Sequence, residues 1–142
     1  MLIPGYRVSS NQLDMDLTVI YNYISNSYWA GNIPINTMKK AMHNSLCFGV
    51  FTDSGQQVAF ARMVTDSATF AYLADVFVVE DHRGKGISKW LMKTILEDKN
   101  LQGIRRMVLE TSDAHGLYEQ FGFKALSCPN IFMELHQPDV YK

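Results

Sequence analysis

The feature that most constrains the fold is a long apolar segment that runs directly into a glycine-containing loop. Residues 69–79 are nearly all apolar, and the loop of residues 80–86 follows them. Apolar runs of this kind are typical of strands that are buried on both faces. After the loop, Ile87, Leu91 and Ile95 recur at helical spacing. The sequence therefore predicts a buried strand, a tight loop and a helix in direct succession.

The elements on either side of this unit follow from apolar spacing and turn residues. Two helices are expected before residue 46, with Asn11 or Asp14 capping the first and Thr37 capping the second. Strands are expected at residues 6–9, 47–52, 57–65, 69–79, 106–111, 123–126 and 131–135, and a short helix at 114–121. Because three strands form a meander, we expect an α/β (α+β) fold with one mixed, mostly antiparallel sheet and helices on both faces.

Composition limits the function classes. A chain of 142 residues with 47% hydrophobic and 19% charged residues is expected to form a single domain, residues 1–142. A net charge of -1 argues against a nucleic-acid or membrane-surface partner, including an acylase that acts on charged tRNA. Two cysteines outside any CxxC pattern, four scattered histidines and no recognisable leader or spanning segment suggest a cytoplasmic protein without a metal.

The loop has the chemistry of an anion site. Glycines at 84 and 86 let backbone N–H groups turn toward an anion, and the N-terminus of the following helix adds partial positive charge. Arg83 and Lys85 can add side-chain charge. The loop is not a P-loop, because Ile87 follows where Ser or Thr is needed, and Lys89 occupies the last glycine position of a dinucleotide fingerprint. Taken alone, the loop is equally compatible with a solvated basic turn.

Two motifs together resemble the GNAT superfamily of N-acetyltransferases. The loop matches the family pattern at five positions: Val78, Arg83, Gly84, Gly86 and Ile87. It departs from that pattern at Glu80, Asp81 and Ser88. A second motif matches downstream at Ala114, Leu117, Tyr118, Gly122 and Phe123, with Thr111 in place of the usual Asn. The two motifs occur in the family's order, so the resemblance extends over residues 46–123.

The resemblance implies acetyl-CoA as co-substrate and a sheet whose two central strands splay apart. Backbone groups of Phe77, Val78 and Val79 would then hold the pantetheine arm, and one N–H there would face the developing oxyanion. The residues expected at the pyrophosphate and neighbouring part of acetyl-CoA are Arg83, Gly84, Lys85, Gly86, Ile87, Ser88 and Thr111.

The resemblance also suggests catalytic residues. Tyr118 would be the general acid for the departing thiolate, although a tyrosine here could also simply fill the core. Asp75 lies on the apolar strand, where a carboxylate is costly unless it is paired or faces a cavity, and it is the first candidate for the general base. Its alternative is a structural ion pair with Arg62. Deprotonation relayed by water remains open, with His115 and Glu110 as lesser candidates.

The acceptor is expected between the first two helices. Tyr28 and Trp29 would line an amine site or fill the core equally well, and Arg62 is grouped with them at the substrate site. The acceptor itself would be a small-molecule amine or a protein amine, and a homodimer is compatible with the family. The alternative to an enzyme is a non-catalytic acyl-CoA-binding or sensor module of the same fold.

Overall fold

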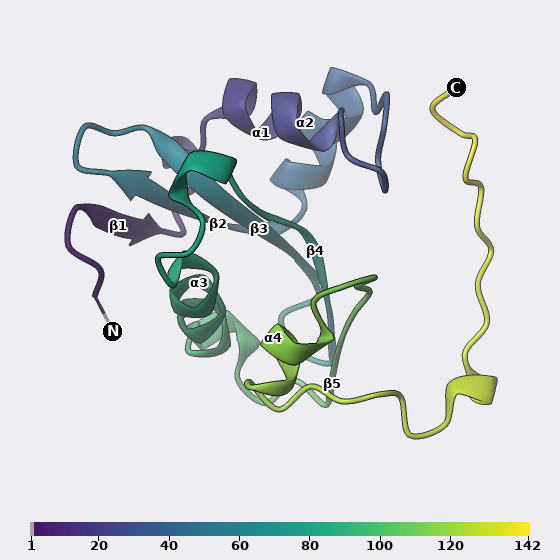
Figure 1. The fold of residues 1–142 in the computed structure, drawn as a ribbon. Coiled ribbons are helices and arrows are strands. Elements are labelled where there is room, and N and C mark those ends of the chain that lie inside the picture. Colours follow the sequence, from purple (N-terminus) through teal and green to yellow (C-terminus); the bar gives the residue numbers. More distant parts are fainter. Residues whose placement is uncertain (1) are drawn as a thin grey trace.

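A five-stranded sheet forms the centre of the computed structural model, which describes residues 2–142 (Figure 1). The strands lie in the order β1-β2-β3-β4-β5. Their bounds are Tyr6–Ser9 for β1, Leu46–Thr52 for β2, Gln57–Thr65 for β3, Phe70–Val78 for β4 and Arg106–Leu109 for β5. The first four pair antiparallel with their neighbours and β5 pairs parallel with β4, which confirms the mixed, mostly antiparallel sheet.

Helices cover both faces of this sheet, as expected. Two apolar clusters, one on each side, show this arrangement, because successive strand residues such as Cys47 and Phe48 enter different clusters. The α-helices are α1 Leu17–Ile24, α2 Ile35–His43, α3 Ile87–Leu96 and α4 His115–Glu119. Helices α1 and α2 pack in one cluster, and α3 packs in the other together with Tyr118 of α4. None of the helices within residues 2–142 is long and apolar enough to cross a membrane.

The two strands β4 and β5 pair over only part of their length. Their register runs from Phe70 opposite Arg106 to Leu73 opposite Leu109, and β4 continues to Val78 without β5 beside it. A register shift between Phe60 and Arg62 marks an irregularity on the other side of β4, where Asp75 has a φ of 55°. Such a bulge bends a strand. The predicted splay of the central strands is therefore present in this sheet.

The predicted helix caps were wrong in detail. Asp16, not Asn11 or Asp14, caps α1 by accepting hydrogen bonds from the amides of Thr18 and Val19. Asn11 instead caps a short 3₁₀ turn that precedes the helix. Helix α2 starts after Pro34 without a side-chain cap, so Thr37 lies inside it. Pattern reasoning found both helices but misplaced their starts, because several capping residues compete in these segments.

Three further expectations differ from the structure. Burial along β4 alternates rather than being complete. The buried residues change face at the bulge, since Ala71 and Leu73 enter one apolar cluster and Phe77 enters the other. Helix α4 is limited to His115–Glu119. No strand forms at residues 123–126 or 131–135; the chain there leaves the body as an exposed arm, with one 3₁₀ turn at Pro129–Ile131 (Figure 1). A strand pattern alone does not supply the neighbouring strand that must complete its hydrogen bonds.

Candidate functional site

The loop between β4 and α3 has the backbone conformation that the two glycines predict. Gly84 and Gly86 have φ values of 77° and 82°, in the left-handed region that side chains with a Cβ disfavour. A Cβ on Gly84 would meet nothing within 4 Å, so the requirement for glycine is conformational rather than steric. Gly86 is the N-cap of α3 and makes no side-chain cap hydrogen bond. The helix therefore begins with its first amides uncapped.

A row of backbone amides is left free by this arrangement. Within residues 2–142, no close hydrogen bond engages the N–H groups of residues 84–89, whereas Trp90 N–H donates to the carbonyl of Gly86 at 3.1 Å. Free amides at a helix N-terminus form an anion-binding site, because the macrodipole adds roughly half a positive charge there. The residues present are thus suited to hold a diphosphate.

The two basic side chains of the loop behave differently. Arg83 turns back toward the sheet, where its Nε donates to the Val78 carbonyl at 2.9 Å and its Nη2 donates to the Tyr23 hydroxyl at 3.0 Å. In this arrangement the Arg83 guanidinium is directed at the end of β4 and at α1. Lys85 is exposed and is the side chain that can reach a bound anion. Sequence reasoning missed Tyr23, whose ring stacks on Phe77 with centroids 4.0 Å apart.

The end of β4 offers fewer free backbone groups than expected. Val79 N–H donates to the Val58 carbonyl at 2.9 Å, and the Val78 carbonyl accepts from Arg83. Neither group is free for a bound pantetheine. The side of β4 that β5 leaves open, beyond Leu73, is where an extended molecule could add as a strand. Phe77 pairs with Phe60, and the Val79 bond to Val58 shows that residues 77 and 79 direct their backbone groups toward β3. Of the three predicted positions, only the amide of Val78 remains available.

Asp75 lies at the bulge and forms the ion pair that was its alternative assignment. Its Oδ2 accepts from Arg62 Nε at 2.8 Å, and its Oδ1 accepts from Trp29 Nε1 at 2.8 Å. Arg62 also donates from Nη1 to the Ser45 hydroxyl at 3.1 Å. The Asp75 and Arg62 side chains are only 6% and 17% exposed. Both carboxylate oxygens are thus engaged, and the cluster joins β3, β4 and the α1–α2 loop.

Tyr118 is buried on α4 and packs in the same apolar cluster as α3. Its ring packs edge-on against Phe123, with centroids 6.0 Å apart. Burial raises the pKa of Tyr118 above its usual value of 10, and the charge of Asp113 raises it further. Tyr118 lines a hollow of about 320 Å³ between the end of β5 and α4, which Thr111 and His115 also line. Tyr118 is therefore a neutral proton donor at physiological pH.

Thr111 has a structural role at the start of α4. Its hydroxyl accepts from the Ala114 amide at 3.0 Å, so this hydroxyl orders the turn into the helix. Nearby, the Tyr28 hydroxyl lies 3.1 Å from Ser112 Oγ, which links the α1–α2 loop to the α4 loop. Tyr28 and Trp29 meet edge-on at 5.0 Å and are 79% and 43% exposed. They therefore form an accessible aromatic rim and not a core plug.

Two other groups bear on the chemistry. Burial raises the pKa of the Cys47 thiol to about 11, so this cysteine is protonated at neutral pH and is a poor nucleophile. Cys128 lies on the exposed arm. No group of three or more potential metal ligands gathers anywhere in the described part of the chain.

The comparisons with known proteins agree with this geometry. The family model described as an acetyltransferase (GNAT) domain matches residues 43–125. A Gibberella zeae protein assigned as an acetyltransferase is 30% identical over 135 aligned residues, which cover 80% of this chain and 75% of that protein. This chain belongs to the GNAT acetyltransferase family. Acetyl transfer is therefore its general chemistry, and acetyl-CoA is the co-substrate that the family uses.

Solved structures extend this result. A GNAT-family protein of Xanthomonas campestris pv. campestris is 46% identical, covers 99% of both chains and superposes with a TM-score of 0.94. A Deinococcus radiodurans structure is 16% identical with a TM-score of 0.75, covers 98% of this chain and 93% of that one, and supports the fold alone. The GNAT fold predicted from the two motifs is thus confirmed, whereas the individual site residues rest on the geometry described above.

Proposed function

We propose that the chain is an acetyl-CoA-dependent N-acetyltransferase that moves the acetyl group to a primary amine by direct transfer in a ternary complex. The observation that carries the proposal is the row of free amides at residues 84–89, which follows the end of β4 that β5 leaves unpaired. Ile87 at the start of α3 and Tyr118 of α4 pack in the same apolar cluster. Acetyl-CoA supplies an activated thioester with a diphosphate far from it. The chain offers a diphosphate site and a proton donor in the same arrangement.

Backbone groups position the donor in this proposal. Amides of residues 84–88 hold the diphosphate, with the Lys85 ammonium beside them. The open side of β4 beyond Leu73 then receives the extended part of the donor, and the Val78 amide is the candidate donor to the developing oxyanion. Preorganised N–H groups of this kind typically contribute about 10²–10³-fold in rate. The bulge at Asp75 bends β4 so that this side stays open.

Proton transfer falls to Tyr118 in this proposal. Its hydroxyl makes no hydrogen bond to any group of residues 2–142, and Tyr118 lines the hollow between the end of β5 and α4. Because burial keeps its pKa above 10, the hydroxyl stays protonated where the attacking amine is already partly neutral. It can then protonate the departing thiolate.

Direct transfer is favoured by the state of the cysteines. Cys47 is buried and protonated, and it lies under α2 with its thiol directed at the Met42 carbonyl. Cys128 lies on the arm, outside the splay. An acyl-enzyme route would need an activated thiolate at the splay. We therefore propose that the amine attacks the thioester itself.

The acceptor enters from the α1–α2 loop in this proposal. Tyr28 and Trp29 form an aromatic rim, and Asp75 with Arg62 lies beneath it. An aromatic rim over a carboxylate favours a cationic amine that loses its proton on approach. Because Asp75 is already paired on both oxygens, we assign it to positioning Trp29 and Arg62, and deprotonation to water that reaches the rim.

The test combines binding and turnover. Thermal shift with CoA should raise the melting temperature, because a ligand that binds only the folded state stabilises it. Thiol release from acetyl-CoA should then appear with members of an amine panel that includes polyamines, amino sugars and peptide N-termini. CoA binding without turnover of any amine would support the sensor alternative instead. Absence of binding would contradict the assignment of the loop.

A further inference from the structure

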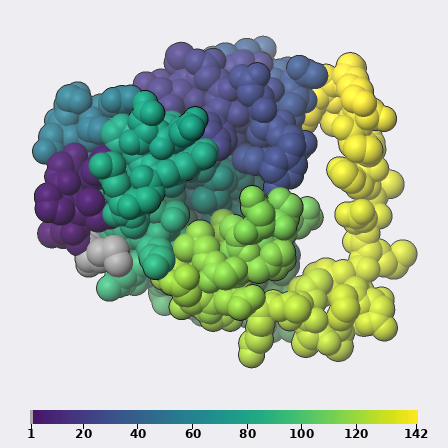
Figure 2. Space-filling model, in the orientation of Figure 1, coloured from purple at the N-terminus to yellow at the C-terminus, as the bar shows by residue number. Residues whose placement is uncertain are grey.

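One arginine side chain ties the loop after β4 to helix α1. Arg83 Nε donates to the Val78 carbonyl at 2.9 Å, and Arg83 Nη2 donates to the Tyr23 hydroxyl at 3.0 Å. Figure 2 shows the teal surface of the loop lying against the purple-blue surface of α1. Two engaged donors fix both the place and the plane of a guanidinium. The Arg83 head group therefore has a defined position, although the residue is exposed.

Tyr23 is in turn held by the strand that Arg83 contacts. Its ring stacks on the Phe77 ring, with the centroids 4.0 Å apart and the two planes at 7°. Phe77 is only 4% exposed and packs in the apolar cluster of α1 and α2. Stacking of this kind adds to the stabilisation from burial. Because Phe77 directly precedes Val78 in the chain, the Tyr23 hydroxyl is fixed relative to the end of β4.

The arginine contact lies on the open side of β4. Residues 77 and 79 direct their backbone groups toward β3, so the N–H and the C=O of Val78 both point away from β3. Strand β5 pairs with β4 only as far as Leu73 and does not cover Val78. The guanidinium that binds the Val78 carbonyl therefore lies beside the Val78 N–H, which is the candidate donor to the developing oxyanion.

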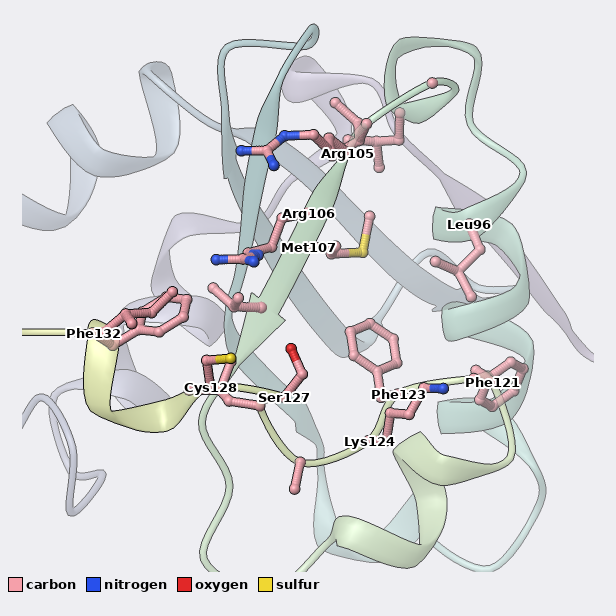
Figure 3. A pocket seen from close by; sticks show the side chains of 18 residues that line it. Leu96, Arg105, Arg106, Met107, Phe121, Phe123, Lys124, Ser127, Cys128 and Phe132 are labelled. Carbon is pink, nitrogen blue, oxygen red and sulfur yellow. The ribbon is translucent and has the colours of Figure 1, made fainter.

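Other arginines of the sheet are directed elsewhere. Arg62 forms its buried ion pair with Asp75. Arg105 and Arg106 border a hollow of about 630 Å³ between β5 and the returning chain, as Figure 3 shows. Of these four arginines, Arg83 is the one whose head group lies at the end of β4 where the acetyl donor is proposed to bind.

We propose that Tyr23 is a positioning residue, which holds the Arg83 guanidinium beside the Val78 amide so that its positive charge stabilises the oxyanion formed during transfer. This inference rests on the proposed function. Charge that is already in place where negative charge develops lowers the barrier to reaction. In this role the Arg83 side chain acts on the reacting carbonyl, whereas the loop amides and Lys85 hold the diphosphate.

The two possible roles of the Arg83 side chain differ in what they change. An arginine on the diphosphate contributes mainly to the affinity for CoA, through a charge-assisted contact that salt weakens. An arginine beside the reacting carbonyl contributes to kcat, because the negative charge it stabilises exists only in the transition state and the intermediate. Measuring kcat and CoA affinity in the same variants therefore distinguishes the two roles.

The first experiment compares Tyr23→Phe with the wild type. This variant keeps the ring on Phe77 and removes the hydroxyl. We expect kcat to fall about tenfold, less than the roughly 10²–10³-fold of an oxyanion donor itself, because water screens an exposed charge. The Kd for CoA in calorimetric titration should change by less than about twofold. Unchanged kcat in Tyr23→Phe would overturn the proposal.

Substitutions of Arg83 should show the same separation of kcat from affinity. Arg83→Met removes the charge, and Arg83→Lys keeps a charge but lacks the planar set of donors that engages Val78 and Tyr23 together. Both should lower kcat about as much as Tyr23→Phe does and leave the Kd for CoA nearly unchanged. A loss of CoA affinity in Arg83→Met that exceeds its loss of kcat would place the guanidinium on the diphosphate and refute the proposal.

Tyr6→Phe is the matched control for a purely structural effect. The Tyr6 hydroxyl lies 2.7 Å from His82 Nδ1, so this variant also loses a hydrogen bond to the loop, one residue before Arg83. It leaves the bonds of the guanidinium in place, and its kcat should equal that of the wild type. Equal losses of kcat in Tyr6→Phe and Tyr23→Phe would show that both hydroxyls only brace the loop, and positioning would be wrong.

The second experiment observes the contact without turnover. In isotope-labelled protein free of ligand, the Arg83 Nε–H should give an NMR signal that exchanges slowly with water, identified by its absence in Arg83→Met. Tyr23→Phe should speed this exchange, and Tyr6→Phe should not. An exchange rate that ignores the Tyr23 hydroxyl would contradict the inference alone. If the wild type instead binds no CoA or acetylates no amine, the proposed function fails, and this inference fails with it.

Discussion

Asp75 combines a buried charge with a backbone conformation that few side chains adopt. Its φ of 55° is tolerated by Asp and Asn better than by most residues, and its carboxylate is held by Arg62 and Trp29. The same residue thus shapes the bulge of β4 and neutralises Arg62. The sequence indicated that a carboxylate on an apolar strand must be paired or face a cavity. The structure shows that it is paired, with Arg62 and Trp29.

Asp75→Asn separates the charge from the conformation. Asn keeps the left-handed preference and an oxygen for Trp29, but it leaves Arg62 as an uncompensated buried charge. Breaking a buried pair in this way costs about 3–5 kcal/mol, and we expect a loss of about 3 kcal/mol in the free energy of unfolding measured with urea. In Arg62→Met combined with Asp75→Asn, most of the loss should be recovered. A loss below about 1 kcal/mol in the single variant would show that the pair contributes little.

Tyr118→Phe tests the general acid. The ring would keep its packing on Phe123, so the fold should persist while the proton donor is lost. General acid catalysis typically contributes 10²–10⁴-fold, and we expect kcat to fall by about 10²-fold with little change in the KM for acetyl-CoA. Tyr6→Phe removes a hydroxyl that binds His82 and serves as the control. An unchanged kcat at every pH would make the acid assignment wrong.

The pH profile follows from the raised pKa of Tyr118. An acid must be protonated to act, so its activity persists below its pKa and is lost as the pH rises through it. Because burial raises that pKa above 10, we expect the rate to rise with pH as the acceptor amine loses its proton, without a decline below pH 10. The measurement is kcat against pH with one amine. A decline near pH 8 that Tyr118→Phe abolishes would contradict this pKa.

At the level of elements, the junction of β4 and α3 depends on two glycines in left-handed conformations. Gly84→Val should weaken CoA binding at least tenfold, because a β-branched residue in this conformation costs more than the roughly 1–2 kcal/mol of an ordinary side chain. Gly84→Asn is the matched variant, since Asn tolerates this conformation and a Cβ there meets nothing. It should retain most of the affinity in calorimetric titration. Equal losses in both variants would show that space, not conformation, matters.

The sequence predicted this junction well because its signals are local. Apolar spacing, two glycines and a helix start all lie within residues 69–96, so the loop and its free amides followed from short-range rules. The hydrogen bonds of the Arg83 side chain and of the Val79 amide could not be predicted from these rules. Their partners, Tyr23 and Val58, lie far away in the sequence. The same limit explains why no strand forms after Phe123. The strand pattern is present there, but a strand also needs a neighbouring strand to complete its hydrogen bonds, and that neighbour lies in another part of the chain.

For the whole molecule, CoA binding at residues 84–89 should be coupled to global stability. A ligand that binds only the folded state adds about 2.7 kcal/mol to the free energy of unfolding at 100 times its dissociation constant. The melting temperatures of the wild type and of Gly84→Asn should therefore rise with CoA concentration, and that of Gly84→Val should rise much less. Differential scanning fluorimetry over a hundredfold range of CoA concentration is the measurement, and equal shifts in all three proteins would contradict a role of the loop in CoA binding.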